Sequence, residues 1–318
     1  MSGDSSLTQP PSHPDTASCI IEAMNNMRLL NLLSLLLSLN LSFSTCLAVE
    51  PVKVESKEVT ILSLDRTKIK QGEFFQALIK NANKPPRIWF NSKEFPSYEI
   101  ICSPKTYRVL IPVENMTNPG KYSILAKLDS WEQKIPVEVT DNGKGVSKIT
   151  LSPDKADLYP TEKELNYVGR NLHITSPTKL WRSKFIYPSK ADRSSPFGVK
   201  RSYNGGPVDS YHKGLDFAGE MGSPVYAPAD ARVLLTGYEK DGFVVHGNTI
   251  ILDHGQSVTS IYMHLSKIDV KEGQPVKQGD KIGEVGHTGV STGPHLHWGV
   301  YLSGVSTEPE LFVKQEVL

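Results

Sequence analysis

The sequence predicts an all-β protein with two domains, an antiparallel sandwich followed by a second antiparallel β-rich domain. Three observations lead to this prediction. Short apolar or alternating segments recur between turn signals along most of the chain. Glycine and proline are frequent, with 24 and 22 residues, which suits many tight turns. A length of 318 residues favours two domains over one.

An apolar stretch from Leu29 to about Leu47 precedes both domains. Arg28 before it and small residues ending at Ala48 after it are typical of a secretory signal peptide. We therefore assign residues 1–48 to a leader and signal peptide and expect an exported protein in the periplasm or cell envelope. A stretch of this length could also stay uncleaved and tether the protein to a membrane.

The net charge and the cysteine content limit which partners and which disulfide bonds we expect. A formal net charge of +1 gives no argument for a nucleic-acid partner. Removal of the leader would take Cys19 and Cys46 and leave Cys102 alone, so we expect that thiol to be buried and outside any disulfide.

The first domain is expected at residues 50–141. Turn signals at 71–72, 83–86 and 118–120 separate its segments. Six or seven strands at this spacing favour a sandwich. They are expected at Val59–Leu62, Phe74–Lys80, Arg87–Phe90, Tyr98–Cys102, Tyr107–Val113, Tyr122–Leu128 and Ile135–Thr140. The domain has no cluster of His, Asp or Glu at metal-ligand spacing, so we interpret it as a spacer, docking module or inhibitory cover.

Residues 142–190 are expected to form a linker that wraps one domain onto the other. Thr161, followed three residues later by Glu164, predicts the start of a short helix with a capping box. A segment of this kind could also cover a groove in the second domain.

The second domain is expected at residues 191–318, where glycine is frequent and all but two of the nine histidines lie. No helix is expected in it. Its strands are expected at Val225–Ala227, Ala231–Thr236, Thr249–Leu252, Thr259–Met263, Lys281–Val285 and Leu296–Leu302.

Five side chains in this domain suit a metal site. His295 and His297 are two apart, so in a strand they face the same side. His212 and Asp216 lie in a glycine-rich loop that leads into a strand, and His264 ends another strand, whose alternation places it on the side of Tyr262. Two imidazoles and a carboxylate are what a catalytic zinc binds, with one position left open.

The order of these motifs resembles the lysostaphin-type, or LytM-like, zinc metallopeptidases. The matching stretches are Ser195–Gly198, His212–Asp216, Gly222–Ala227, Tyr262–Leu265, Val270–Val276, Gly279–Gly283, Ser291–His297 and Glu308–Pro309. The sandwich before them also looks like the immunoglobulin-like domain that precedes the peptidase in some exported members.

The resemblance implies one zinc ion per chain, held by His212, Asp216 and His297, and two unliganded catalytic histidines, His264 and His295. It further implies a metalloendopeptidase that hydrolyses peptide bonds in the stems or cross-bridges of peptidoglycan. Which histidine is the general base stays open. Some relatives have lost these residues, so the alternative is a non-catalytic wall-binding or amidase-activating protein.

Other aromatic and imidazole side chains receive weaker assignments. Tyr203 or Tyr262 could add a hydrogen bond to the tetrahedral oxygen of the reaction. Three more histidines follow turn-like patterns and are expected at the surface or the cleft rim, and these are His246, His254 and His287. Trp298 follows the last proposed ligand on the opposite face of the strand and is expected in the core.

Overall fold

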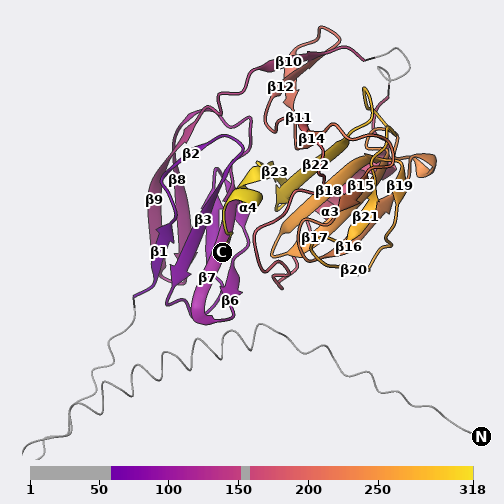
Figure 1. Ribbon diagram of the computed structural model, residues 1–318. Helices are drawn as coiled ribbons and strands as arrows, with labels where there is room; N and C mark the ends of the chain where they lie inside the picture. The colour runs from indigo at the N-terminus through magenta and orange to yellow at the C-terminus, as the bar shows by residue number, and fades with distance from the viewer. Residues whose placement is uncertain (1–58, 152–157, 318) are drawn as a thin grey trace, which may run out of the picture. The chain divides into compact units, whose positions relative to one another are not determined.

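The computed structural model describes residues 59–151 and 158–317. The leader and signal peptide expected at residues 1–48 lie outside this range. Nearly every element within it is a strand (Figure 1), so the predicted all-β architecture is confirmed. Within these two ranges, no helix has both the length and the apolar character that crossing a bilayer would take.

Nine strands form two sheets near the N-terminus, as the sandwich prediction requires. The first sheet has the order β1-β3-β7-β6 and the second the order β2-β9-β8-β4-β5. Their bounds are β1 Ile61–Leu64, β2 Lys68–Lys70, β3 Phe74–Lys80, β4 Arg87–Phe90, β5 Lys93–Phe95, β6 Tyr98–Ile100, β7 Ser103–Pro112, β8 Gly120–Leu128 and β9 Trp131–Thr140. Phe75, Ile88 and Ile124 are fully buried between the sheets. One pair departs from the antiparallel expectation, because β2 runs parallel to β9.

A larger sheet carries the C-terminal half, with the order β11-β14-β22-β18-β17-β16-β20 and β23 beside β22. The bounds of its strands are β11 Arg193–Ser195, β14 Leu215–Phe217, β16 Ala231–Gly237, β17 Asn248–Gly255, β18 Val258–Leu265, β20 Pro275–Val276, β22 Leu296–Leu302 and β23 Val305–Thr307. Two small sheets accompany it, β10-β12-β13 and β15-β21-β19. Their strands are β10 Val146–Ile149, β12 Lys200–Tyr203, β13 Val208–Tyr211, β15 Pro224–Tyr226, β19 Lys267–Ile268 and β21 Lys281–Glu284.

Short helices complete the described fold. α3 spans Glu162–Leu172 and begins where predicted, since the Thr161 hydroxyl accepts a hydrogen bond from the backbone nitrogen of Glu164. The expectation of no helix in the second domain is wrong in detail. A 3-10 turn, η1, spans Glu239–Asp241, and α4 spans Glu310–Lys314.

The two faces of the large sheet pack against different partners. Tyr262 and Trp298 point into the main C-terminal core. Residues on the opposite face of the sheet, including Ile261 and Tyr301, pack instead against Val168 of α3 and the residues around it. Because His297 alternates with Trp298 along β22, α3 covers part of the face that carries this histidine.

The sandwich and the C-terminal sheet share buried contacts. Phe74 of β3 belongs to the same apolar cluster as Phe312 of α4, with ring centroids 5.2 Å apart. The carbonyl of Gly72 accepts hydrogen bonds from the Thr307 hydroxyl at 2.9 Å and from the Glu308 backbone nitrogen at 2.8 Å. These contacts join residues 59–318 into one compact unit.

The expectation for Cys102 is wrong. Its side chain is exposed rather than buried, and it is disulfide-bonded.

Candidate metal centre

Strand register brings the proposed ligands together. β14 and β22 are antiparallel neighbours, and their register places Asp216 opposite His297. On the other side of β22, Met263 of β18 lies opposite His297. His212 enters from the loop that precedes β14, four residues before Asp216. Segments separated by about eighty residues therefore meet on the middle strands of one sheet.

The three side chains converge on one point. His212 Nε2 lies 2.9 Å from Asp216 Oδ1 and 3.0 Å from His297 Nδ1, and His297 Nδ1 lies 2.9 Å from Asp216 Oδ1. All three residues are buried. Gly214 permits this approach, because a Cβ there would lie 2.7 Å from His297 Nε2. The geometry is that of a compact three-donor metal site.

The donor set of this cluster suits a cation at its centre. His212 Nδ1 lies 2.8 Å from the Pro196 carbonyl, which can only accept, so Nδ1 donates to it and Nε2 is the nitrogen that faces Asp216. Burial lowers the pKa of His297 to about 4, which leaves that imidazole neutral. Burial opposes ionisation of Asp216, but the nitrogens of His212 and His297 outweigh it and keep the pKa of its carboxyl below the ordinary value. Two imidazoles and an ionised carboxylate fit a divalent ion such as zinc.

His264 and His295 lie beside this cluster, with ring centroids 4.8 Å apart. His264 Nδ1 lies 2.9 Å from the Thr288 carbonyl, and His295 Nδ1 lies 2.8 Å from the Gly293 carbonyl. Each Nδ1 therefore donates to the backbone, and each Nε2 is left as the nitrogen that can accept a proton. His295 Nε2 lies 3.9 Å from Asp216 Oδ1, close to the cluster but outside it.

The prediction that His264 lies on the same side of its strand as Tyr262 is wrong. Tyr262 points into the core, whereas the His264 ring lies 6.4 Å from the His297 ring, on the other face. The cause is a left-handed backbone at His264, with φ of 64°, which breaks the alternation at the end of β18. Burial and the neighbouring imidazoles of His295 and His297 lower the pKa of His264 well below its ordinary value.

Two weaker assignments are corrected. Tyr262 is fully buried on the core side, with its hydroxyl 2.9 Å from Ser260 Oγ, so it does not reach the metal cluster. His254 is not a rim residue but lies within β17, fully buried, with Nε2 2.8 Å from Ser260 Oγ. The core assignment of Trp298 is confirmed. The Tyr203 hydroxyl accepts a hydrogen bond from Arg201 at 3.1 Å.

Several residues at the site were not singled out from the sequence. Arg201 Nη2 lies 3.7 Å from Asp216 Oδ2, and the Ser195 hydroxyl lies 3.2 Å from His212 Nδ1. Thr288 supplies the carbonyl that holds His264. No local pattern marks Arg201 or Thr288, since each acts through a contact with a distant segment, whereas Ser195 belongs to a stretch that resembles the family.

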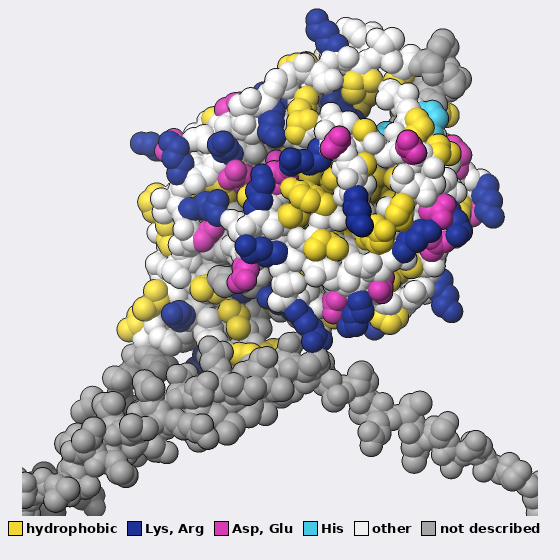
Figure 2. Space-filling model, in the orientation of Figure 1, with side chains coloured by type: hydrophobic (Ala, Val, Ile, Leu, Met, Phe, Trp, Pro, Cys, Tyr) yellow, Lys and Arg dark blue, Asp and Glu magenta, His cyan; other side chains and the backbone are white. Residues whose placement is uncertain are grey.

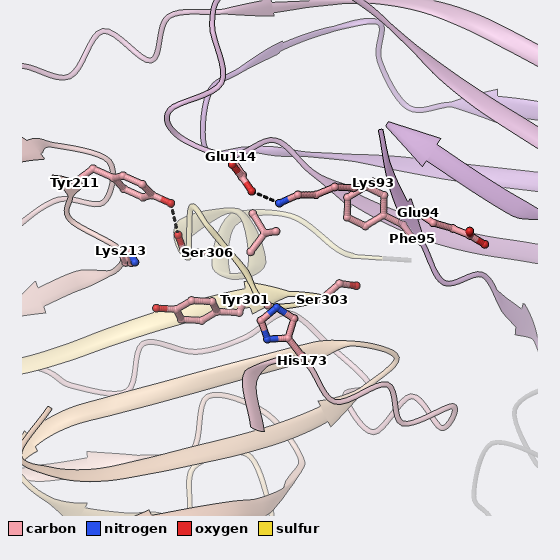
Figure 3. Close-up of a pocket in the computed structure, with 12 residues that line it drawn as sticks. Lys93, Glu94, Phe95, Glu114, His173, Tyr211, Lys213, Tyr301, Ser303 and Ser306 are labelled. Atoms are coloured by element: carbon pink, nitrogen blue, oxygen red, sulfur yellow. Dashed lines mark hydrogen bonds and ion pairs between the residues drawn. The ribbon is translucent and has the colours of Figure 1, made fainter. Parts of the chain in front are cut away.

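Access to the cluster is narrow. His212 has no exposed side-chain surface, whereas His295 is 17% exposed. Little histidine surface shows on the face in the space-filling view (Figure 2). Tyr211 and Lys213, which flank His212 in sequence, line a neighbouring pocket of about 520 Å³ together with Tyr301 (Figure 3). None of the three converging ligands lines this pocket.

Comparison with known proteins gives the family of this domain. Residues 210–309 match the family model "Peptidase family M23". A metalloprotease of Haemophilus influenzae is 43% identical over 130 residues, covering 40% of this chain and 26% of its own length. Peptidoglycan DD-endopeptidase ShyA of Vibrio cholerae is 40% identical over 127 residues, covering 39% of this chain and 29% of its own length. The chain thus spans under a third of either relative.

A solved structure extends the likeness beyond the matched domain. A crystal structure of a peptidase M23 from Pseudomonas aeruginosa has a TM-score of 0.56 and 27% identity, and the alignment covers 76% of this chain and 94% of that one. The three-donor cluster and the neighbouring His264 and His295 lie within the matched range. Residues 210–309 of this chain therefore form a domain of peptidase family M23.

Proposed function

We propose that the protein is a zinc-dependent endopeptidase that hydrolyses peptide bonds in the stems or cross-bridges of peptidoglycan. The observation that carries the proposal is the three-donor cluster of His212, Asp216 and His297 with two unliganded imidazoles beside it. The substrate class follows the relatives, one of which is named a peptidoglycan DD-endopeptidase.

His212, Asp216 and His297 would hold one zinc ion per chain. When bound, such an ion lowers the pKa of water towards 7 and polarises a carbonyl oxygen. His264 and His295 supply the proton chemistry. One Nε2 takes the proton of the attacking water and returns it to the leaving amine, while the other imidazole, in its doubly protonated form, donates from Nε2 to the carbonyl oxygen as negative charge develops there. No covalent intermediate is needed.

The backbone-anchored rings of His264 and His295 suit this task. Each Nδ1 is fixed to a carbonyl, so each ring keeps one tautomer and one orientation before substrate arrives. Pre-organised groups of this kind lose little free energy to reorganisation during reaction.

We also propose export to the periplasm or cell envelope, with residues 1–48 as leader, 50–141 as an immunoglobulin-like sandwich, 142–190 as the connecting segment and 191–318 as the peptidase domain. A substrate in peptidoglycan supports this location. A retained leader would add a membrane tether.

The alternative is a non-catalytic wall-binding or amidase-activating protein. The presence of both unliganded histidines disfavours it, because a protein that only binds needs no imidazole with an open Nε2. Zinc content separates the two functions, since an activator without a working site would carry no stoichiometric metal.

The test is digestion of defined muropeptides, read by mass spectrometry, with zinc measured in the same samples. We expect the wild type to cleave one class of peptide bond. His297→Ala should lose both zinc and cleavage, whereas His264→Ala should keep zinc and cleave about 10²–10⁴-fold more slowly. His173→Ala, at an exposed histidine, serves as the control. Wild-type rates from His264→Ala, or a zinc-loaded wild type that cleaves no muropeptide, would contradict the proposal.

A further inference from the structure

Glu164 has a buried carboxylate that its own helix does not use. The sequence predicts a capping box in which this side chain returns to the start of α3. Only half of that motif forms, because Thr161 accepts from the Glu164 nitrogen while the Glu164 carboxylate turns away. The Glu164 side chain is fully buried.

The carboxylate binds the turn at Val245 and His246 instead. Glu164 Oε1 accepts hydrogen bonds from the backbone nitrogens of His246 at 2.7 Å and Val245 at 3.1 Å, and His246 Nδ1 donates to the same oxygen at 2.6 Å. A buried carboxylate is costly unless donors surround it. Burial opposes its ionisation, but the hydrogen bonds from His246 outweigh that effect and hold the pKa of Glu164 below its ordinary value.

The Val245–His246 turn also holds the backbone of His264. The His246 carbonyl accepts a hydrogen bond from the His264 backbone nitrogen at 3.0 Å. This bond replaces the pairing that His264 would otherwise make with a neighbouring strand. The backbone of His264 is left-handed there, with φ of 64°, and this conformation brings its ring to the three-donor cluster.

The second anchor of His264 rests on the same turn. Thr288, whose carbonyl accepts from His264 Nδ1, receives through its hydroxyl a hydrogen bond from the Asn248 nitrogen at 2.9 Å. The Val290 nitrogen donates to the Val245 carbonyl at 2.9 Å. Both groups that orient the His264 ring therefore depend on the Val245–Asn248 segment, and Glu164 fixes one end of it.

We propose that Glu164 is a positioning residue for His264, acting through the Val245–His246 turn from a helix that lies outside residues 210–309. This inference rests on the proposed function, because it assigns Glu164 to the geometry of one of its two unliganded histidines. α3 is on this account part of the catalytic domain rather than a passive linker.

The experiment compares Glu164→Gln and Glu164→Ala in the full chain with two controls on the same helix. Val168→Ala removes buried apolar contacts of α3 without touching the turn, and Glu162→Gln changes an exposed carboxylate. Measurements are kcat and KM on a defined muropeptide, zinc content, thermal unfolding, and the ¹⁵N ring resonances of His264 in labelled protein.

We expect Glu164→Gln to lower kcat on the order of 10- to 100-fold, because small displacements of a catalytic group cost about this much. KM and zinc content should stay unchanged, and the His264 ring resonances should shift. Glu164→Ala should lose more than Glu164→Gln, since glutamine keeps one acceptor oxygen. Val168→Ala should lower the unfolding temperature yet keep kcat and the ring resonances of wild type.

Equal kcat losses in Glu164→Gln and Val168→Ala, or unmoved His264 resonances in both Glu164 variants, would overturn the inference. The ring resonances also separate this inference from the proposed function. If the wild type cleaves no muropeptide, the proposed function fails, while a shift of His264 signals in Glu164→Gln still supports the positioning role and its absence still refutes it.

Discussion

A single carbonyl determines how His212 presents itself to its neighbours. The Pro196 carbonyl accepts a hydrogen bond from Nδ1, so Nε2 is the nitrogen that lies 2.9 Å from an oxygen of Asp216. A bound divalent ion would lie among Nε2 of His212, the Asp216 carboxylate and Nδ1 of His297. The fixed orientation of the His212 ring therefore favours a metal here.

At the residue scale, Asp216→Asn tests whether the Asp216 carboxylate is a metal ligand. Asparagine keeps the size of the side chain but removes the charge, so we expect zinc affinity to fall by more than the 10–100-fold that outer-shell changes cause. Competition with a chromophoric chelator measures it. Asp209→Asn, at an exposed carboxylate in β13, is the matched control. Equal affinities in Asp216→Asn and wild type would remove Asp216 from the ligand set.

His254 makes a separate prediction about acid stability. Burial lowers its pKa to about 4 from the ordinary 6.5, so the unfolded chain binds a proton below pH 6.5 that the folded chain refuses until about pH 4. Its contribution to stability is present above pH 6.5 and is lost as pH falls through this window. Between pH 7 and 5 the wild type should lose about 2 kcal/mol of unfolding free energy through this residue.

Chemical denaturation at both pH values measures that loss. His254→Gln cannot ionise, so its stability should fall less over the same interval, whereas His173→Gln should behave as wild type. A pH dependence of His254→Gln identical to that of wild type would show that His254 is not the group responsible.

At the scale of elements, α3 is amphipathic and uses one face. Val168 and Leu172 are buried on the large sheet, whereas Leu165 is 55% exposed. The stability of the helix therefore comes from tertiary packing, since eleven residues are too few for an isolated helix in water.

Leu172→Ala should destabilise the protein by about 2–5 kcal/mol, the range for truncating a buried leucine. Leu165→Ala on the same helix should change stability by less than about 0.5 kcal/mol. Denaturant unfolding followed by circular dichroism measures both. Similar losses in the two variants would mean that α3 does not pack on the sheet as described.

At the scale of the whole molecule, one glycine lies in close contact at the junction between sandwich and peptidase sheet. Gly72 has φ of 83°, and a Cβ there would overlap the ring of Phe197. Its carbonyl accepts the two hydrogen bonds from Thr307 and Glu308. Gly143 also has a left-handed backbone, with φ of 71°, but a Cβ added there would have no atom within 4 Å.

Gly72→Ala should therefore cost more stability than Gly143→Ala. The second change carries only the left-handed strain of about 1–2 kcal/mol, whereas the first adds an overlap with Phe197. Differential scanning calorimetry of both variants measures the difference. Equal unfolding temperatures would indicate that the two domains do not meet at Gly72.

Much of the site could be predicted from the sequence because the relevant signals are local. The two-residue spacing of His295 and His297 follows from strand geometry, and the helix start at Thr161 follows from capping chemistry. Residue type and motif order predict the five-residue set, and three of its members converge within hydrogen-bond distance. Strand positions likewise follow from alternation and turns.

Contacts between distant segments could not be predicted in this way. The side on which His264 lies depends on a left-handed backbone at a strand end, which alternation does not encode. The partner of Glu164 lies about eighty residues away, and the local pattern suggested a different one.

The sequence by itself determined the fold class, the helix start and the choice of side chains that meet at the candidate site, because residue type and short-range periodicity express backbone geometry directly. Only the tertiary structure decided which face His264 occupies, which nitrogen of His212 faces Asp216, and which turn Glu164 of α3 binds. Those outcomes depend on packing and hydrogen bonds between segments that no local pattern connects.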